Sequence, residues 1–332
     1  MIQIPDFFTI RQRTTLQNES FNELALEVFR YQYQQNHWYR KFCDLSNKSS
    51  EKVLYYTDIP FLPVSFFKQQ PVCCFEPVWA ERIYTSSGTT GSNTSRHYVR
   101  KYADYKMSFE TAFHQFYGDP KDYCILALLP GYLEREGSSL IEMAQELIKA
   151  SQHPKSGFYL NNYRDLIHTV NQLQQKGQKT LLLGVTYALL DLAEMGPFNW
   201  PDLIVMETGG MKGKRREMIR EELHEQLKTG LGVSAIHSEY GMTELLSQAY
   251  SQGNGIFNCP PWMKILTRDT YDPLTLRVDG KTGGVNIIDL ANIDSCSFIA
   301  TQDLGRLHPD GSFEIMGRFD NSDIRGCNLM VG

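Results

Sequence analysis

The chain has 332 residues, of which 42% are apolar and 21% are charged, and its formal net charge is −5. This length and apolar content can bury a sizeable core in one large domain or two closely packed lobes, which argues against a disordered chain. The acidic balance and the lack of a long Lys/Arg block argue against nucleic acid as a partner.

The N-terminal stretch "MIQIPDFFTIRQRTT" lacks a basic segment followed by a long apolar one, and apolar runs such as "ILALLP" are too short to span a bilayer. We therefore expect a cytoplasmic protein without a membrane span. The seven cysteines are widely scattered and form no C-x-x-C pair, so most are expected to be reduced core residues. They are Cys43, Cys73, Cys74, Cys124, Cys259, Cys296 and Cys327.

The predicted elements alternate between helices and strands along the chain. A helix is predicted over residues 21–34, after a capping Ser20, and the proline-rich segment 58–72 is predicted to be a packed connection without regular structure. The alternation that follows predicts a largely parallel sheet covered by helices. Its strand-like runs are residues 81–85, 123–129, 179–185, 202–208, 233–240 and 283–290, and its helical patterns are residues 140–151, 163–177 and 214–229. Residues 305–318, around Pro309-Asp310-Gly311, predict a hairpin and an antiparallel last lobe.

The segment "YTSSGTTGSN", residues 84–93, follows a predicted strand and consists mostly of glycines and hydroxyl residues. Small residues let consecutive backbone N–H groups converge, and hydroxyls add donors, so such a loop is suited to phosphate oxygens. The spacing of a Walker A loop is absent. On its own the segment is equally compatible with an ordinary surface loop.

Three later segments suit a nucleotide. "ETGGMKGK", residues 207–214, has paired glycines where a planar base can approach the backbone, and "SEYGMTE", residues 238–244, offers an aromatic ring, a hydroxyl and a carboxylate. "TQDLGRL" and "MGRFDN" supply Asp303, an acceptor for ribose hydroxyls, and Arg318, a donor for ribose or phosphate.

In this order the four segments resemble the motifs of the adenylate-forming superfamily, which includes acyl-CoA synthetases and firefly luciferase. The resemblance spans residues 85–324 and implies an α/β fold, the large N-terminal domain of these enzymes, with mostly parallel sheets covered by helices and a small antiparallel β lobe. We expect this adenylation domain over residues 1–318, with a mostly helical segment at 1–80. We expect residues 319–332 to be a short C-terminal tail that replaces the usual lid domain, and we expect that lid domain to be absent.

The resemblance also implies ATP and Mg²⁺ as cofactors and assigns roles to single residues. Tyr240 would stack on adenine, and Thr243 would contact the α-phosphate. Gly241 is the turn glycine of the same motif, and Gly209 and Gly210 are the paired glycines where the base can approach the backbone. Glu244 binds magnesium, while Asp303 and Arg318 hold the ribose side. The residues expected to wrap the β- and γ-phosphates are Ser86, Ser87, Gly88, Thr89, Thr90 and Gly91.

The sequence departs from the superfamily pattern at two places, and these departures favour one family within the superfamily. We expect the lid lysine to be missing together with the lid domain. Where a lysine usually closes the phosphate loop, the sequence offers Arg96 and only later Lys101, which can supply charge but not identical geometry. The upstream "PFLPVSFFK" and the "GC" at Cys327 resemble the acyl-protein synthetase (LuxE) family. This resemblance implies a ligase that activates a fatty acid as its adenylate, moves the acyl group to Cys327, and delivers it to a partner such as an acyl reductase or acyl carrier protein.

Alternative readings stay open. The chain could be a phenylacetate-type acyl-CoA ligase, or a non-catalytic module that binds a nucleotide or a partner protein. Cys327 could be a structural thiol, His237 a hydrogen-bonded structural residue, and Lys212 and Lys214 part of a solvated helix face. Four aromatic residues at helical spacing are expected to pack in the core rather than line an acyl tunnel: Phe109, Phe113, Phe116 and Tyr117.

Overall fold

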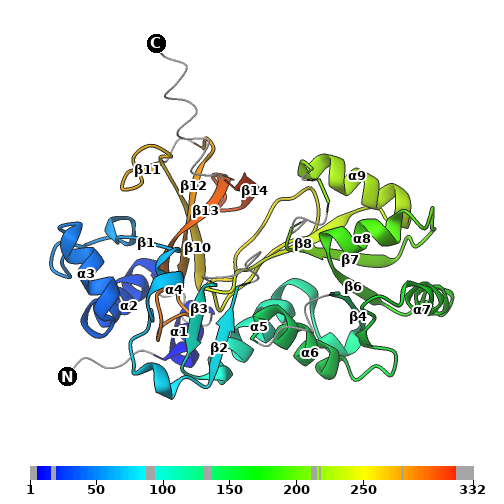
Figure 1. The fold of residues 1–332 in the computed structure, drawn as a ribbon, viewed down its shortest axis with the longest axis horizontal. Coiled ribbons are helices and arrows are strands. Elements are labelled where there is room, and N and C mark those ends of the chain that lie inside the picture. Colours follow the sequence, from blue (N-terminus) through cyan, green and yellow to red (C-terminus); the bar gives the residue numbers. More distant parts are fainter. Residues whose placement is uncertain are drawn as a thin grey trace, which may run out of the picture. The chain divides into compact units, whose positions relative to one another are not determined.

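The protein is described by a computed structural model over residues 6–15, 20–86, 94–130, 137–210, 215–216, 218–277 and 280–318 (Figure 1). The chain forms two compact units. The first unit consists of Met1–Glu76 and Pro261–Gly332, and the second unit is Pro77–Pro260. The predicted boundaries at residues 80 and 318 stay a prediction. Within the described residues, no helix has the length and apolar character needed to cross a membrane.

The second unit is built on a six-stranded sheet with the order β5-β4-β6-β7-β8-β9. Every neighbouring pair is parallel except β8 and β9. All residues of β4 and β6 are buried, as expected for central parallel strands that helices cover on both faces. The predicted parallel sheet is thus confirmed. The strands are β4 (Cys124–Leu128), β5 (Gly157–Phe158), β6 (Thr180–Val185), β7 (Leu203–Thr208), β8 (Ile236–Tyr240) and β9 (Ala249–Ser251).

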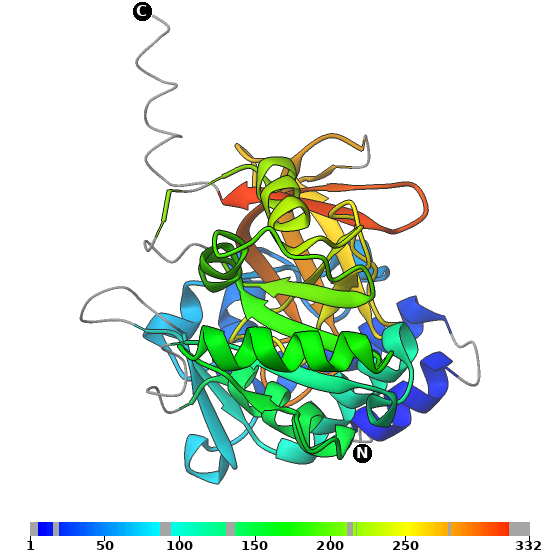
Figure 2. The same cartoon turned by 90° about the vertical axis from the view of Figure 1, so that its right-hand side faces the viewer.

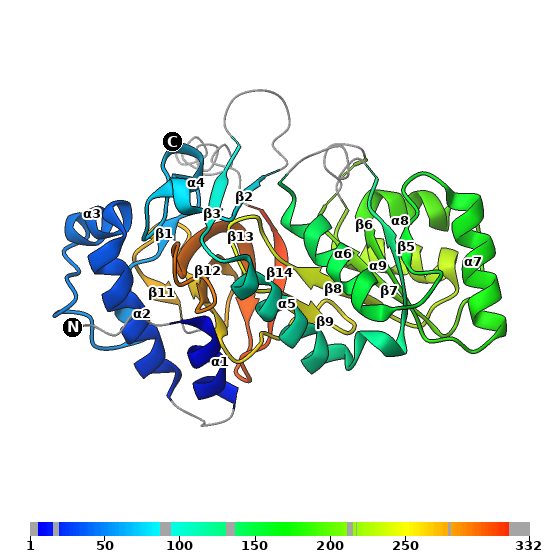
Figure 3. The same cartoon turned by 90° about the horizontal axis from the view of Figure 1, so that it is seen from below.

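Helices cover both faces of this sheet. Figures 1 and 3 show α5 (Tyr102–Tyr117) and α6 (Ser139–Ser151) on one face. On the other face lie α7 (Tyr163–Gln175), α8 (Thr186–Ala193) and α9 (Arg220–Leu231). Two 3₁₀ turns, η2 (Pro77–Trp79) and η3 (Pro120–Asp122), complete the helical elements described in this unit.

Helix α9 begins later than predicted. Arg215, Arg216 and Ile219 belong to no helix, although the pattern predicted a helix from residue 214. Basic residues are unfavourable at a helix N-terminus, where the helix dipole is positive, whereas Glu221 and Glu222 in the first turn of α9 are favourable. The helix therefore starts beyond most of the basic cluster.

A two-stranded hairpin in the second unit flanks the glycine-rich segment. Strands β2 (Arg82–Thr85) and β3 (Arg96–Val99) are antiparallel, and Thr85 lies opposite Arg96. The strand predicted over residues 81–85 does form, as β2, but grouping it with the parallel sheet was wrong, because β2 pairs with β3 in a separate antiparallel sheet. Residues 87–93 connect the two strands.

The first unit combines N-terminal helices with a second sheet. The helices are α1 (Phe7–Thr15), α2 (Phe21–Gln35), α3 (His37–Leu45), η1 (Tyr56–Asp58) and α4 (Phe66–Gln69). Helix α2 confirms the prediction for residues 21–34. The expectation that segment 58–72 has no regular structure was wrong, because α4 and strand β1 (Leu62–Pro63) lie in it. A strand is compatible with the prolines of this segment, because β1 is only two residues long and lies at the edge of its sheet.

The sheet of the first unit is antiparallel apart from β1, which pairs with β13 in parallel. Its order is β1-β13-β12-β10-β11, and β14 also pairs with β13. The remaining strands are β10 (Met263–Arg268), β11 (Leu276–Arg277), β12 (Gly283–Asp289), β13 (Phe298–Leu307) and β14 (Phe313–Arg318).

The β13–β14 hairpin confirms the antiparallel last lobe, and Figure 2 shows it with β14 in red. The antiparallel part extends beyond this hairpin to a six-stranded sheet, because residues 283–290, grouped by sequence with the parallel strands, form β12. A fully buried apolar run does not reveal the direction of its partner strand.

Gln32 fastens α2 to the loop before β13. Its side chain is fully buried, and its Nε2 donates to the carbonyl oxygens of Asn292 at 2.9 Å and Ile293 at 2.8 Å. The same nitrogen lies 3.0 Å from Ser297 Oγ, and Gln32 Oε1 accepts from Ser297 N at 3.0 Å. One side chain therefore satisfies polar groups of a segment about 260 positions away in the chain.

We predict that Gln32→Leu lowers the free energy of unfolding by about 2–4 kcal/mol, because buried polar groups lose their partners. Gln34→Leu, at an exposed position of the same helix, changes it by less than about 0.5 kcal/mol. Urea unfolding of both variants checks this. Equal unfolding midpoints for the two variants would contradict the role of Gln32.

Candidate functional site

The glycine-rich segment is described only at its ends. Ser86 N donates to Ser95 O at 3.2 Å, and Ser86 Oγ accepts from Ser95 N at 3.0 Å. Ser86 thus closes the base of the loop through its oxygen, and its hydroxyl hydrogen can still be donated to a phosphate. The other predicted phosphate-binding residues, Ser87, Gly88, Thr89, Thr90 and Gly91, lie outside the described residues, so their roles stay predictions.

His97 joins this hairpin to the "YGMTE" segment. It is fully buried on β3, and its Nδ1 lies 2.8 Å from the carbonyl oxygen of Thr243. A carbonyl oxygen can only accept, so Nδ1 carries the hydrogen. Two segments that lie 146 positions apart in the chain are thereby held together within one unit. Sequence reasoning missed His97, whose signal is its inward-facing position in the strand "RHYV".

The "YGMTE" segment follows β8 directly. Tyr240 is half-buried, and its ring centroid lies 6.0 Å from that of Phe257 in an edge-on arrangement. Gly241 is exposed, Thr243 is half-buried, and Glu244 is buried with 6% of its surface exposed. The strand end thus carries the predicted aromatic, hydroxyl and carboxylate groups within five consecutive residues.

Glu244 was predicted to bind magnesium. Among the described residues, no group of three His, Cys, Asp or Glu side chains converges to form a metal cage. Mg²⁺ is commonly bound by one or two carboxylates together with substrate phosphates, and a single carboxylate such as Glu244 fits that mode. The magnesium role of Glu244 stays a prediction.

Gly209 and Gly210 form an exposed turn at the end of β7. Gly209 has φ +71°, a left-handed conformation that side chains other than glycine rarely adopt. A Cβ added to Gly210 would meet no atom within 4 Å, so this side of the backbone is open. The geometry suits the predicted approach of a flat base, while Lys212 and Lys214 lie outside the described residues.

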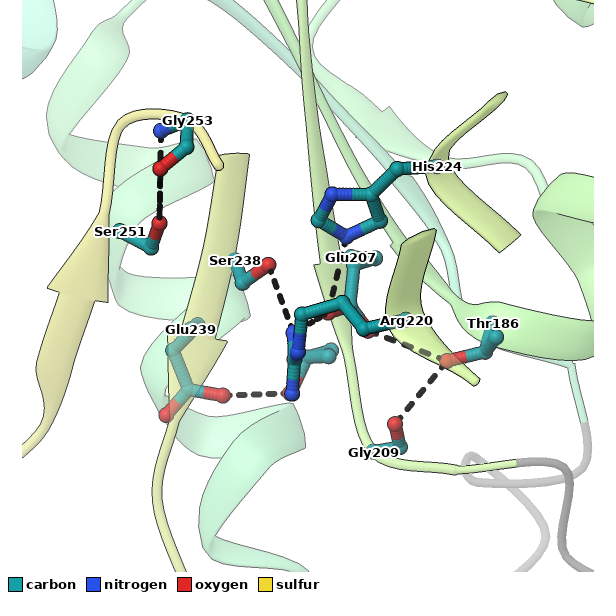
Figure 4. A network of polar contacts seen from close by, with 10 residues as sticks. Thr186, Glu207, Gly209, Arg220, His224, Ser238, Glu239, Ser251 and Gly253 are labelled. Carbon is teal, nitrogen blue, oxygen red and sulfur yellow. Dashed lines mark hydrogen bonds and ion pairs between the residues drawn. The ribbon is translucent and has the colours of Figure 1, made fainter. Parts of the chain in front are cut away.

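A polar network lies beside this turn (Figure 4). Glu207, on β7, is 5% exposed, and its Oε1 accepts from Arg220 Nη1 at 2.7 Å. Arg220 Nη1 also lies 3.2 Å from Ser238 Oγ on β8, and His224 Nε2 lies 3.8 Å from Glu207 Oε1. The hydroxyl of Thr186 lies 3.1 Å from Glu207 Oε2 and 2.9 Å from the carbonyl oxygen of Gly209. None of these contacts was predicted from the sequence.

The pleat of the sheet separates two buried carboxylates. Glu207 lies beside Ser238 in the strand register, whereas the next position, Thr208, lies beside Glu239. Successive side chains of a strand point to opposite faces, so Glu207 and Glu239 face opposite sides of the sheet. The hydroxyl of Thr208 donates to Glu239, completing a second carboxylate–threonine pair.

The two faces give these carboxylates different pKa values. Burial alone would raise the pKa of Glu207, but His224 and Arg220 outweigh it and lower that pKa. Burial raises the pKa of Glu239 to about 7, against a smaller opposing effect of the Thr208 hydrogen bond. The difference arises because Glu207 has a guanidinium partner, whereas Glu239 is hydrogen-bonded to a neutral hydroxyl.

Asp303 and Arg318, the predicted ribose-side residues, lie in the first unit. They are register partners on β13 and β14, and Arg318 Nε donates to Asp303 Oδ1 at 3.0 Å. The Asp303 side chain is 8% exposed and that of Arg318 is 73% exposed. The pair therefore presents a buried carboxylate acceptor beside an exposed guanidinium group. The roles of Asp303 and Arg318 toward a nucleotide stay predictions.

Four buried cysteines lie in environments that disfavour the thiolate. Burial raises the pKa of Cys43 to about 12 and that of Cys124 to about 11, and it also raises those of Cys73 and Cys296. Because the thiolate is the nucleophile, these four are poor acyl acceptors. Cys327 lies outside the described residues, and its role stays a prediction.

His237 and three of the four aromatic residues of α5 pack as the sequence predicted. Phe116 is only half-buried, and its ring centroid lies 5.3 Å from that of Tyr250. His237 Nδ1 lies 3.1 Å from Tyr117 Oη, and burial lowers the pKa of His237. Phe109, Phe113 and Tyr117 are buried, and the rings of Phe113 and Tyr117 stack with centroids 5.2 Å apart. These contacts are those of core residues.

The raised pKa of Glu239 predicts a pH dependence of stability. A carboxyl group with a folded pKa of about 7 and an ordinary value of 4.5 binds more protons when folded, so its contribution is complete below pH 4.5 and lost as the pH rises through 7. Relative to Glu239→Gln, the wild type should lose up to about 3 kcal/mol of unfolding free energy over this window.

Denaturant unfolding of both proteins at several pH values measures this difference. Glu207→Gln is the matched comparison, and its pH dependence should run in the opposite direction. Because the pKa of Glu207 is lowered, its contribution to the unfolding free energy is complete above the ordinary pKa and is lost as the pH falls through the folded pKa. A wild-type-minus-Glu239→Gln difference that is constant with pH would contradict the assigned environment.

The chain is similar to known proteins in sequence and in fold. The family model described as acyl-protein synthetase, LuxE, matches residues 10–113. A long-chain-fatty-acid–luciferin-component ligase from Vibrio harveyi is 23% identical over 341 residues, covering 95% of this chain and 88% of the relative. These two matches confirm the expected resemblance and the assignment to the ligases.

Solved structures of two ligases share the fold. A 2-hydroxyisobutyryl-CoA ligase in complex with 2-HIB-AMP and CoA has a TM-score of 0.68 at 14% identity, over 93% of this chain and 74% of the ligase. ATP-bound MatB from Rhodopseudomonas palustris has a TM-score of 0.52 at 15% identity, over 71% of this chain and 47% of MatB. The chain is thus similar to the acyl-protein synthetase (LuxE) family and has the fold of the adenylate-forming ligases.

Proposed function

We propose that the protein activates a long-chain fatty acid with ATP as an acyl-adenylate and then transfers the acyl group to Cys327 as a thioester. The observation that carries this proposal is the hydrogen bond of His97 to Thr243 O at 2.8 Å. It holds the hairpin that carries "TSSGTTGS" beside the "YGMTE" segment, so the residues expected at the phosphates and at the α-phosphorus belong to one body.

In the first step a carboxylate oxygen of the acid attacks the α-phosphorus of ATP. The bond between the α-phosphorus and the bridging oxygen to the β-phosphorus breaks, and pyrophosphate leaves. Ser86 and the residues that follow it would donate hydrogen bonds to the leaving phosphates, and Thr243 would donate to the α-phosphate, where negative charge develops. Such preorganised donors lower the barrier without reorganisation at the moment of reaction.

Magnesium, held by Glu244 together with the phosphates, would supply charge neutralisation when bound. Tyr240 and the Gly209–Gly210 turn would hold the adenine, since both stand at the carboxyl ends of adjacent parallel strands. Asp303 would accept hydrogen bonds from the ribose hydroxyls, with Arg318 as a neighbouring donor.

In the second step the Cys327 thiolate attacks the carbonyl carbon of the acyl-adenylate. A carbon–sulfur bond forms, the bond to the phosphate oxygen breaks, and AMP leaves. Burial disfavours the thiolates of four described cysteines, which supports assigning this step to a cysteine elsewhere. The thioester would then be delivered to a partner protein such as an acyl reductase or an acyl carrier, in the cytoplasm.

The substrate class rests on the name of the Vibrio harveyi relative, a long-chain-fatty-acid ligase. The second candidate is an acyl-CoA ligase of the phenylacetate type, favoured by the fold shared with 2-hydroxyisobutyryl-CoA ligase. The two reactions share the adenylate and differ in the acceptor, which is a protein thiol in one case and free CoA in the other. A non-catalytic module would form no adenylate at all.

We predict that incubation with ATP, magnesium and a long-chain fatty acid adds one acyl group to the intact protein. Neutral hydroxylamine should remove this group, because thioesters are cleaved by it. Cys327→Ser should form no hydroxylamine-labile adduct yet still release pyrophosphate. Intact-protein mass spectrometry and a pyrophosphate assay give the two readouts.

Cys259→Ser is the matched control, because Cys259 is the half-buried cysteine among the described thiols. It should label like the wild type. Acyl-CoA formation without a protein adduct would favour the CoA ligase, and the absence of both adduct and pyrophosphate with every acid would favour the non-catalytic module.

A further inference from the structure

Thr186 lies between the buried carboxylate of Glu207 and the Gly209–Gly210 turn, which is expected to face adenine. Its hydroxyl lies 3.1 Å from Glu207 Oε2 and 2.9 Å from the carbonyl oxygen of Gly209 (Figure 4). The Thr186 side chain is 2% exposed, so water does not compete for these contacts. Both partners are acceptors and the hydroxyl has one hydrogen, so that hydrogen is shared between the carboxylate and the carbonyl oxygen of the turn.

Helix capping does not explain this hydroxyl. Thr186 is the first residue of α8, and the capping position belongs to Val185, which makes no side-chain capping bond. The Thr186 hydroxyl instead points across to β7, where both of its partners lie. Its contacts connect the end of β6 with the end of β7.

Glu207 itself is held from the far side by Arg220. Arg220 is the first residue of α9, a position where the helix dipole disfavours a cation. Its Nη1 donates to Glu207 Oε1 at 2.7 Å, and its guanidinium carbon lies 5.1 Å from the ring centroid of Phe257. These contacts account for an arginine at an otherwise unfavourable site, and they fix one oxygen of Glu207 so that the other faces Thr186.

The strand register leaves room for this arrangement. Glu207 on β7 has two register neighbours, Gly184 on β6 and Ser238 on β8. A Cβ at Gly184 would meet the Leu189 side chain at 2.6 Å, so a larger residue here would require that side chain to shift. Without a side chain on that neighbour, the Glu207 carboxylate can reach Thr186 at the end of β6.

We propose that Thr186 is a positioning residue for the adenine end of ATP: its hydroxyl hydrogen, shared between Glu207 Oε2 and the Gly209 carbonyl oxygen, restrains the Gly209–Gly210 turn. A carbonyl oxygen has two lone pairs, so this hydrogen bond restrains the turn and leaves the second acceptor position available. Restraining the turn before ATP binds removes part of the ordering cost of binding. This inference rests on the proposed function, because it assigns the turn to the nucleotide.

The test compares three single variants. Thr186→Val keeps the branched shape and removes the hydroxyl, whereas Thr186→Ser keeps the hydroxyl. Thr180→Val is the matched control, because Thr180 is a fully buried residue at the other end of β6 whose hydroxyl donates to Gln178 O at 2.8 Å. Each protein is assayed for ATP–pyrophosphate exchange, for AMP binding by calorimetry, and for its thermal midpoint.

Loss of one buried hydrogen bond should raise both the KM for ATP and the Kd for AMP roughly three- to tenfold in Thr186→Val. The KM for the fatty acid should stay within about twofold, since the turn is assigned to the nucleotide alone. Thr186→Ser should restore both ATP and AMP values. Thr180→Val should lower the thermal midpoint as much as Thr186→Val while keeping wild-type values for both nucleotides.

The inference is overturned if Thr186→Val keeps wild-type ATP and AMP values, or if Thr180→Val weakens nucleotide binding equally. It is also overturned if the wild type binds no AMP. A wild type that binds AMP but catalyses no exchange with any acid would refute the proposed function, and the AMP affinities of the variants would still decide the role of Thr186.

Discussion

The parallel alignment of β6, β7 and β8 is the constraint on which the candidate site of the second unit depends. It brings the ends of three strands to one edge of the sheet, where Val185, Thr208 and Glu239 lie side by side in the register. Thr186, the Gly209–Gly210 turn and Tyr240 follow at the same edge because each comes directly after one of these residues. Ligands of open α/β sheets bind at such edges.

The alternation of side chains along the same strands produces two different electrostatic environments. One face holds Glu207 against Arg220, so a buried carboxylate stays ionised and can accept hydrogen bonds. The other face holds Glu239 against Thr208, where burial without a cation favours the protonated form. Charge is therefore kept on the face that fixes the glycine turn, and it is reduced on the face that packs against the aromatic residues of α5. The β2–β3 hairpin joins the same unit through His97.

Much of the fold could be predicted because its signals are local. The apolar runs of β4, β6 and β7 and the spacing in α2, α6 and α7 depend only on neighbouring residues. Strand direction is not local, which explains why β12 was grouped with the parallel strands although it belongs to the antiparallel sheet. The start of α9 was missed because helical periodicity does not register the cost of basic residues at a helix N-terminus.

The residues of the candidate site also fall into those that local sequence signals identified and those that they missed. Gly209, Gly210, Tyr240, Thr243 and Glu244 were found by sequence because they occur in short contiguous motifs. His97, Thr186, Glu207 and Arg220 were missed, because each acts through a partner that is distant in sequence and only the register brings the partners together. Motifs thus point to the residues proposed to face a ligand, whereas the residues that hold those motifs in place are visible only in the structure.

The central claim, that the protein forms an acyl-adenylate, is tested most directly by acid-dependent exchange of labelled pyrophosphate into ATP. This exchange reports reversal of adenylate formation and requires no acyl acceptor. The account predicts exchange with long-chain fatty acids in the wild type and in Cys327→Ser, and a loss of at least about tenfold in Glu244→Gln, whose carboxylate is assigned to magnesium. Exchange that is absent with every acid, or that is unchanged in Glu244→Gln, would contradict it.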